Sequence, residues 1–117
     1  MDENELKQRT KGFALRVMEL AEFLPKTLAG RTIGSQLVRC GTSVGANYRA
    51  VCRSRSKAEF VARLGTVEEE ADEAGYWMEL IIEGKLIDRN RVVLLLQEAG
   101  ELTAIMAASR KSAAGRR

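Results

Sequence analysis

The chain has 117 residues, of which 45% are hydrophobic and 30% are charged, and its formal net charge is +3. This length fits one domain, and the composition is typical of a folded globular chain rather than a disordered one. The longest stretch without a charged residue, Cys40 to Tyr48, is far shorter than the roughly 20 apolar residues of a membrane span. We therefore expect one hydrophobic core and no membrane partner.

The first five residues are acidic in character and lead directly into an amphipathic pattern. They match neither a signal peptide nor an Arg-rich transit peptide, so we predict a cytoplasmic protein. Cys40 and Cys52 are separated by eleven residues, and the chain contains no His. This spacing favours two reduced, partly buried thiols over a zinc site or a redox pair.

The first predicted helix covers roughly residues 4–24. Pro25 ends it, because the proline ring cannot continue the helical hydrogen bonds. Its expected core residues are Leu6, Phe13, Val17, Leu20 and Leu24. The second predicted helix runs from about residue 31 to residue 53. Its expected core residues are Ile33, Leu37, Cys40, Val44, Tyr48 and Val51.

The third predicted helix opens at Ser56 and Glu59, which are spaced as a capping box, and closes near Gly84. Its apolar seam consists of Phe60, Leu64, Val67, Ala71, Ala74, Met78 and Ile81. The fourth predicted helix begins after Asp88 as N-cap, with Val92, Leu96, Ala99, Thr103 and Met106 as its seam. We predict an all-α fold, an up-down-up-down antiparallel four-helix bundle over residues 1–108, followed by a basic, frayed tail over residues 109–117.

Charge is segregated along the chain. No acidic residue lies between Glu22 and Glu59, whereas the range 59–83 is strongly acidic. At 100° per residue, Arg39, Arg49 and Arg53 project from the second helix on the face opposite its core. This face predicts a nucleic-acid-binding surface that contacts phosphates with little sequence preference. The predicted binding residues are Arg39, Arg49, Arg53, Arg110 and Lys111.

Two further clusters predict contacts between chains. Three glycines share one flank of the second helix, where the backbone of another helix could approach closely; alternatively, they only soften the helix. On the third helix, an aromatic patch faces away from the seam, which is typical of a partner surface unless another helix of the same chain covers it. The predicted oligomer-interface residues are Gly34, Gly41, Gly45, Glu69, Glu73, Tyr76, Trp77 and Leu80.

The sequence offers little catalytic chemistry. Without His it has no Ser-His-Asp triad and no Glu-x-x-His metal site, and it contains no GxxxxGK[ST] phosphate-binding loop. The consecutive acids of residues 68–73 diverge around their helix, which favours a solvated face over a metal site. We therefore expect no enzymatic activity, no metal and no cofactor.

Two stretches resemble a known bacterial family. They are GSQLVRCGTSVGANYRAVCRSRSKAEF at residues 34–60 and EEEADEAGYWMELI at residues 68–81. They are similar to the four-helix-bundle proteins encoded in intervening sequences of 23S ribosomal RNA genes. The matching positions are Gln36, Leu37, Arg39, Ser43, Val44, Asn47, Ser56, Glu59, Phe60, Glu70 and Glu73.

The resemblance implies a four-helix bundle that assembles into a ring-like homo-oligomer, typically a pentamer. The chain also resembles the accessory proteins of diversity-generating retroelements, which implies RNA or DNA and a reverse transcriptase or other protein as partners. The resemblance to the family implies no catalytic residues. Two functions therefore compete: a nucleic-acid-associated accessory protein, and a protein-binding oligomeric scaffold in which Glu69 and Glu73 of a neighbour neutralise the arginines.

Overall fold

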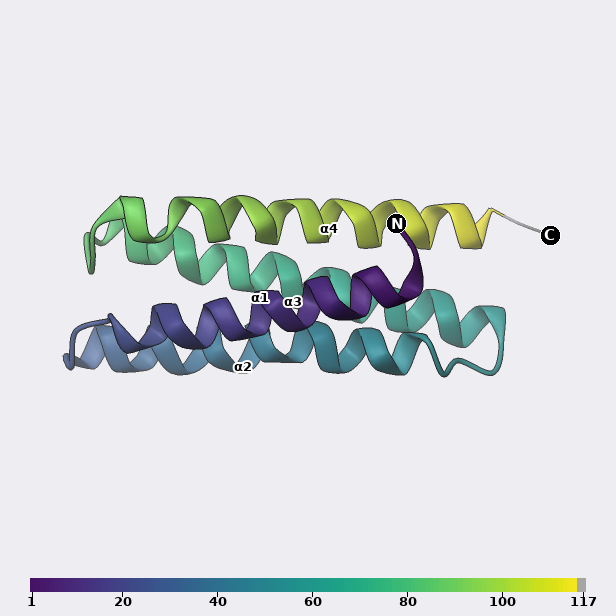
Figure 1. The fold of residues 1–117 in the computed structure, drawn as a ribbon, viewed down its shortest axis with the longest axis horizontal. Coiled ribbons are helices and arrows are strands. Elements are labelled where there is room, and N and C mark those ends of the chain that lie inside the picture. The colour runs from purple at the N-terminus through teal and green to yellow at the C-terminus, as the bar shows by residue number, and fades with distance from the viewer. Residues whose placement is uncertain (116–117) are drawn as a thin grey trace.

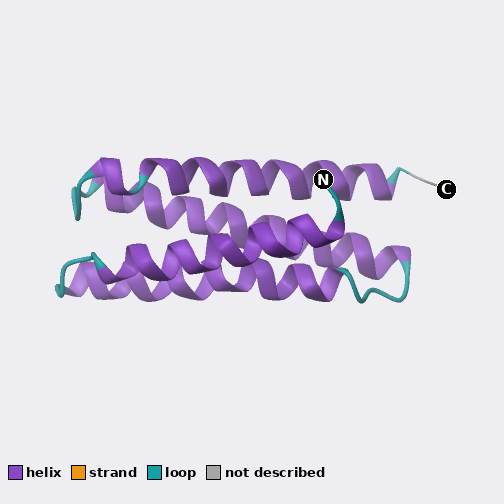
Figure 2. Ribbon diagram, in the orientation of Figure 1, coloured by secondary structure: helices purple, strands orange, loops and turns teal. Residues whose placement is uncertain are grey.

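The computed structural model describes residues 1–115, which form four long helices joined by short connections. The elements are α1 (Glu3–Glu22), α2 (Leu28–Val51), α3 (Lys57–Glu83), η1 (Arg89–Arg91) and α4 (Val93–Ala114). Figure 1 shows the helices running in alternating directions along a body of 50 × 22 × 19 Å. Figure 2 shows helices and loops, without a strand, throughout the described residues. The predicted all-α, up-down-up-down bundle is confirmed.

Short polar side chains fix where the helices begin. Asp2, Thr27 and Ser56 each accept a hydrogen bond from the backbone N–H three residues further on, at 2.8, 3.1 and 3.1 Å respectively. Each such cap satisfies an amide that has no partner inside the helix and contributes about 1 kcal/mol. Asp88 differs from the prediction, because it accepts from the N–H of Asn90 at 3.0 Å and so caps η1, not α4.

The C-terminal end of α4 also differs from the prediction. The helix continues to Ala114, so the frayed tail predicted from residue 109 is wrong for residues 109–114. Arg110 explains the extension, since its Nε donates to Glu68 Oε1 of α3 at 2.8 Å and its Cδ packs over Gly65. The last two predicted tail residues, Arg116 and Arg117, lie outside the described residues.

The core runs along the centre of the bundle. All five core residues expected for the first helix are buried, although Leu24 lies just beyond the end of α1. On α2, Leu37, Cys40, Val44, Tyr48 and Val51 are buried, whereas the predicted Ile33 is half-buried. On α3 the seam is buried from Leu64 to Ile81, whereas Phe60 is half-buried. On α4, Leu95 and Leu102 are buried in addition to the predicted Ala99 and Met106, while the predicted Leu96 and Thr103 are half-buried. In the bundle, α1 packs mainly on α2, α2 on α3 and α3 on α4, with lighter contact between α1 and α4.

Three glycines of α2 allow α1 to approach closely. A Cβ on Gly41 would stand 2.7 Å from Val17 Cγ1, and one on Gly45 would stand 3.4 Å from the backbone of Thr10. A Cβ on Gly34 would stand 3.2 Å from Leu24 Cδ1, just beyond the end of α1, and both Gly34 and Gly41 are buried. The close approach predicted from these glycines is thus made by α1 of the same chain. Their assignment to a contact between chains is wrong for Gly34 and Gly41, because neither is accessible to a second chain.

Candidate nucleic-acid interface

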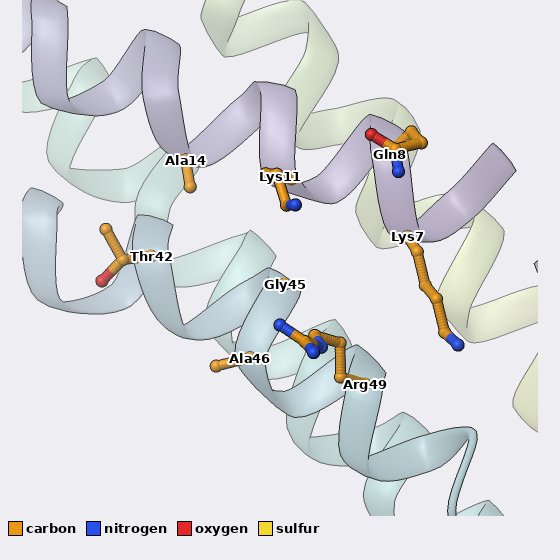
Figure 3. A pocket seen from close by; sticks show the side chains of 8 residues that line it. All are labelled: Lys7, Gln8, Lys11, Ala14, Thr42, Gly45, Ala46 and Arg49. Carbon is orange, nitrogen blue, oxygen red and sulfur yellow. The ribbon is translucent and has the colours of Figure 1, made fainter. Parts of the chain in front are cut away.

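An open groove of about 370 Å³ lies between α1 and α2, near the start of α1 and the end of α2. Figure 3 shows the side chains that line it, with Lys7 and Lys11 coming from α1 and Arg49 from α2. The lining residues are Lys7, Gln8, Lys11, Ala14, Thr42, Gly45, Ala46 and Arg49. These eight residues include three cationic side chains and no carboxylate, so the groove concentrates positive potential where an anion can enter.

The local sequence explains why this groove is both hollow and basic. Lys7 and Lys11 are four residues apart on α1 and therefore project from the same face of the helix. Gly45 has no side chain and Ala46 has only a methyl group, so these residues fill little of the space between the two helices. Arg49 lies in the last turn of α2, where the helix dipole favours a cation.

The cations of this region differ in how far they are neutralised. Lys7 Nζ lies 3.3 Å from Glu3 Oε1. Within residues 1–115, Lys11, Arg49 and Arg53 form no ion pair, and all three are exposed. Of the arginines predicted from the sequence, Arg49 thus lines the groove with its charge available, and Arg53 is an exposed cation just beyond the end of α2.

Two other predicted binding residues are neutralised within the chain. The guanidinium of Arg39 contacts the carboxylate of Glu73 and lies 3.6 Å from Glu70 Oε2. Arg110 donates to Glu68, as described above. We therefore remove Arg39 and Arg110 from the candidate interface. The alternative that Glu73 of a neighbouring subunit neutralises the arginines is corrected for Arg39, since its acids belong to the same chain. For Arg49 and Arg53 that alternative stays a prediction.

The remaining predicted residues are spread over other surfaces. Lys111 is exposed on α4 and Glu69 on α3. Tyr76 is 52% exposed, in keeping with a partner surface, and its ring contacts Trp77 edge-on at 5.2 Å between centroids. Trp77 itself does not face away from the core. Trp77 packs partly against the core, and its Nε1 donates to Glu73 Oε2 at 2.9 Å. Leu80 is half-buried.

Two groups near Arg39 have shifted pKa values. Burial, reinforced by the charge of Glu73, raises the pKa of the Cys40 thiol to about 12. This thiol stays protonated at neutral pH and is therefore a poor nucleophile. Burial also raises the pKa of Glu70, although the charge of Arg39 opposes this shift. Among residues 1–115 no cluster of three potential metal ligands was found, and no helix there is long and apolar enough to cross a membrane.

Lys7 and Lys11 were not among the binding residues predicted from the sequence. Their spacing of four residues on one helix face was visible, but periodicity within one helix does not reveal which helix packs beside it. Only the pairing of α1 with α2 places these lysines opposite Arg49.

The chain is similar to known proteins in both sequence and structure. Residues 2–108 match the family described as 23S rRNA-intervening sequence protein. The chain belongs to this family. It is also similar to a protein of unknown function from the S23 ribosomal protein family of Bacteroides thetaiotaomicron VPI-5482, whose crystal structure superposes with a TM-score of 0.83 at 30% identity. The match covers 91% of this chain and 98% of the other. No curated protein matches the chain.

In this member of the 23S rRNA-intervening sequence protein family, several residues that carried the resemblance form one network. Gln36 Oε1 accepts from Arg39 Nε at 3.0 Å, and Arg39 in turn contacts Glu70 and Glu73 of α3. Ser43 Oγ donates to the backbone oxygen of Arg39 at 2.7 Å. The network joins α2 to α3, so these motif residues maintain the fold, and the groove between α1 and α2 is a separate feature.

Proposed function

We propose that this protein is a non-enzymatic, oligomeric helical-bundle protein of the cytoplasm that associates with RNA or other nucleic acid. The observation that supports this proposal is the groove between α1 and α2, lined by Lys7, Lys11 and Arg49 without a carboxylate. Arg53 adds a further exposed cation one turn beyond Arg49. Cationic side chains of this kind contact phosphates, which dominate the affinity of proteins for nucleic acid.

The groove favours phosphate contacts over reading of base sequence. None of its eight lining residues is aromatic, so it provides no ring on which a base could stack. Phosphate contacts fix position and contribute no sequence discrimination. We therefore expect binding that is salt-dependent and similar for nucleic acids of different sequence.

The test compares the full chain with a variant that removes two groove charges, Lys11→Gln together with Arg49→Gln. Fluorescence anisotropy with a labelled RNA oligonucleotide, titrated at several salt concentrations, gives the affinity and its salt slope. The wild-type slope should equal about −0.7 for each phosphate contacted on a single strand. Loss of two contacts should reduce the magnitude of the slope by up to about 1.4.

A charge-matched control is Lys85→Gln together with Arg89→Gln, which removes two exposed cations from the connection between α3 and α4. This variant should bind like the wild-type chain. If both double variants reduce binding equally, only net charge matters and the groove is not the interface. Two further measurements would support the proposal. The wild-type chain should be retained on heparin, and RNA should co-purify with the protein, as read from the 260/280 nm absorbance ratio.

The alternative function is a protein-binding scaffold without a nucleic-acid role. Tyr76 favours a protein contact, because a large, half-exposed aromatic side chain on α3 is typical of an interface. The anisotropy experiment distinguishes the two functions. A scaffold would show no nucleic-acid binding at low salt while retaining its oligomeric state.

A further inference from the structure

A second open cavity lies between α1 and α2 at the opposite end of this helix pair, with a volume of about 390 Å³. Two cations, Lys26 and Arg31, line it together with one carboxylate, Glu22. Small and apolar residues, including Ala21 and Val38, form the rest of its wall. The α1–α2 pair is therefore hollowed and net positive at both ends.

The two cavities lie on the same side of α2. At 100° per residue, all the α2 residues that line them except Gly30 fall within about 60° of Arg31 around the helix axis. These residues include Arg31, Ser35, Val38, Thr42, Ala46 and Arg49. The distance along the helix from Arg31 to Arg49 is about 27 Å, from a rise of 1.5 Å per residue.

The same relationship holds on α1. Lys11, Ala14 and Ala21 fall within about 40° of Lys7 around the helix axis, and the exposed Met18 lies on the same stripe between the two cavities. The cavities are thus aligned along one α1–α2 seam, with cations at both ends and an apolar middle. The middle consists of Ala14, Met18 and Val38, together with Thr42, whose hydroxyl donates to the backbone oxygen of Val38 at 2.7 Å.

We propose that a single strand of RNA or DNA lies along the whole α1–α2 seam, with phosphates at the two cationic ends and bases over the apolar middle. This inference rests on the proposed function and specifies its ligand. A single strand exposes the apolar faces of its bases, which can cover Met18 and Val38. A duplex keeps its base faces stacked inside and exposes only sugars, phosphates and polar base edges, so it would leave that middle without a matching surface.

The position of Arg31 supports a role in binding a ligand rather than in stabilising the fold. It lies in the first turn of α2, where the helix dipole disfavours a cation, and no acidic residue occupies that turn. Within residues 1–115 it forms no ion pair. A phosphate bound beside it would interact favourably both with its guanidinium and with the N-terminal end of α2.

Two variants of the full chain test the far end and the middle of the seam. One is Lys26→Gln together with Arg31→Gln, and the other is Met18→Glu. The probes are a labelled oligouridylate of about 16 nucleotides, the upper end of the site sizes of single-strand-binding domains, and an RNA duplex of the same length. Wild-type protein should bind the single strand more tightly. The double variant should reduce the magnitude of its salt slope by up to about 1.4, and Met18→Glu should weaken binding at least tenfold.

The matched controls are Lys85→Gln with Arg89→Gln for the far end and Leu94→Glu for the middle, since Leu94 is an exposed apolar residue of α4. Circular dichroism and native mass spectrometry verify that every variant keeps its fold and oligomeric state. If the seam variants bind like their controls while Lys11→Gln with Arg49→Gln still weakens binding, the inference fails and the proposed function stands. Tighter binding of the duplex, or a lower oligomer order in the far-end variant, also overturns the inference. Absence of all nucleic-acid binding overturns both.

Discussion

Gly41 of α2 lies directly against Val17 of α1, so that a Cβ on the glycine would stand 2.7 and 2.8 Å from the two Val17 methyl groups. Both residues are buried. The contact brings together the backbone of α2 and a β-branched side chain with little rotational freedom. The α1–α2 pair, and hence the groove along its outer side, depends on the missing side chain at residue 41.

Gly41→Ala should therefore destabilise the fold. Overpacking a buried contact costs about 1–3 kcal/mol, which exceeds the gain of up to about 1 kcal/mol in helix propensity. The matched control is Gly100→Ala on α4, where a Cβ would meet nothing within 4 Å. This control should stabilise the chain by up to about 1 kcal/mol. Urea denaturation of both variants measures the difference, and equal stabilisation would show that α1 shifts at no cost.

A second prediction concerns the link between α1 and α4. Arg9 donates to Glu98 through Nε and Nη2, both at 2.7 Å, and this bidentate pair raises the pKa of the guanidinium. The side chains are only 23% and 16% exposed, so the pair is poorly screened by solvent. A double-mutant cycle with Arg9→Gln and Glu98→Gln should give a coupling free energy of about 1 kcal/mol.

The exposed pair of Lys7 with Glu3, four residues apart on α1, provides the comparison for this cycle. Its coupling free energy should be smaller, about 0.3–0.5 kcal/mol. Equal coupling in the two cycles would mean that bidentate geometry and partial burial add nothing to the Arg9 pair. Thermal unfolding at fixed ionic strength is the measurement.

A third prediction concerns pH. Burial raises the pKa of Glu70 above its usual value, and Glu70 Oε2 is buried without a hydrogen-bond partner. Because the folded state holds this proton more tightly than the unfolded state, ionisation of Glu70 destabilises the fold as the pH rises through the raised pKa. Glu70→Gln should therefore stabilise the protein at pH 7 relative to wild type, and this advantage should shrink as the pH falls through the raised pKa and be lost below the usual Glu pKa of about 4.3.

Urea midpoints of wild type and Glu70→Gln at pH 7 and pH 4 measure this dependence. Glu73→Gln is the contrasting variant, since Glu73 accepts from both Arg39 and Trp77 and its loss should destabilise the fold at pH 7. If Glu70→Gln is less stable than wild type at pH 7 and equal to it at pH 4, the attraction of Arg39 outweighs burial at Glu70.

A fourth prediction concerns assembly. We expect a homo-oligomer, and the family resemblance implies a pentamer. Tyr76 is the exposed member of the predicted aromatic patch, so Tyr76→Glu should lower the oligomer order seen by native mass spectrometry while leaving the helical circular dichroism unchanged. Trp77 packs partly against the core, and Trp77→Ala should lower the thermal stability as well. Only monomer for the wild-type chain at micromolar concentration would contradict the prediction.

Much of this protein follows from its sequence alone. The period of its apolar residues determined the number of helices, their approximate bounds and most of the buried positions, because each helix must bury one stripe. The start of α3 after Ser56 and the end of α1 shortly before Pro25 also follow from local chemistry, since capping and the steric effect of the proline ring involve only neighbouring residues. The ends of α4 did not follow, because Asp88 caps η1 and an ion pair with α3 extends the helix at Arg110.

The candidate site depended on tertiary structure. Arg39, Arg49 and Arg53 are all exposed, although Arg53 lies beyond the end of α2, and projection around the helix treated the three as equivalent. Packing separated them: α3 brings Glu73 to Arg39, whereas α1 brings Lys7 and Lys11 to Arg49. The charge on a helix face is a property of one segment and can be read from sequence, while its neutralisation depends on which helix lies beside it.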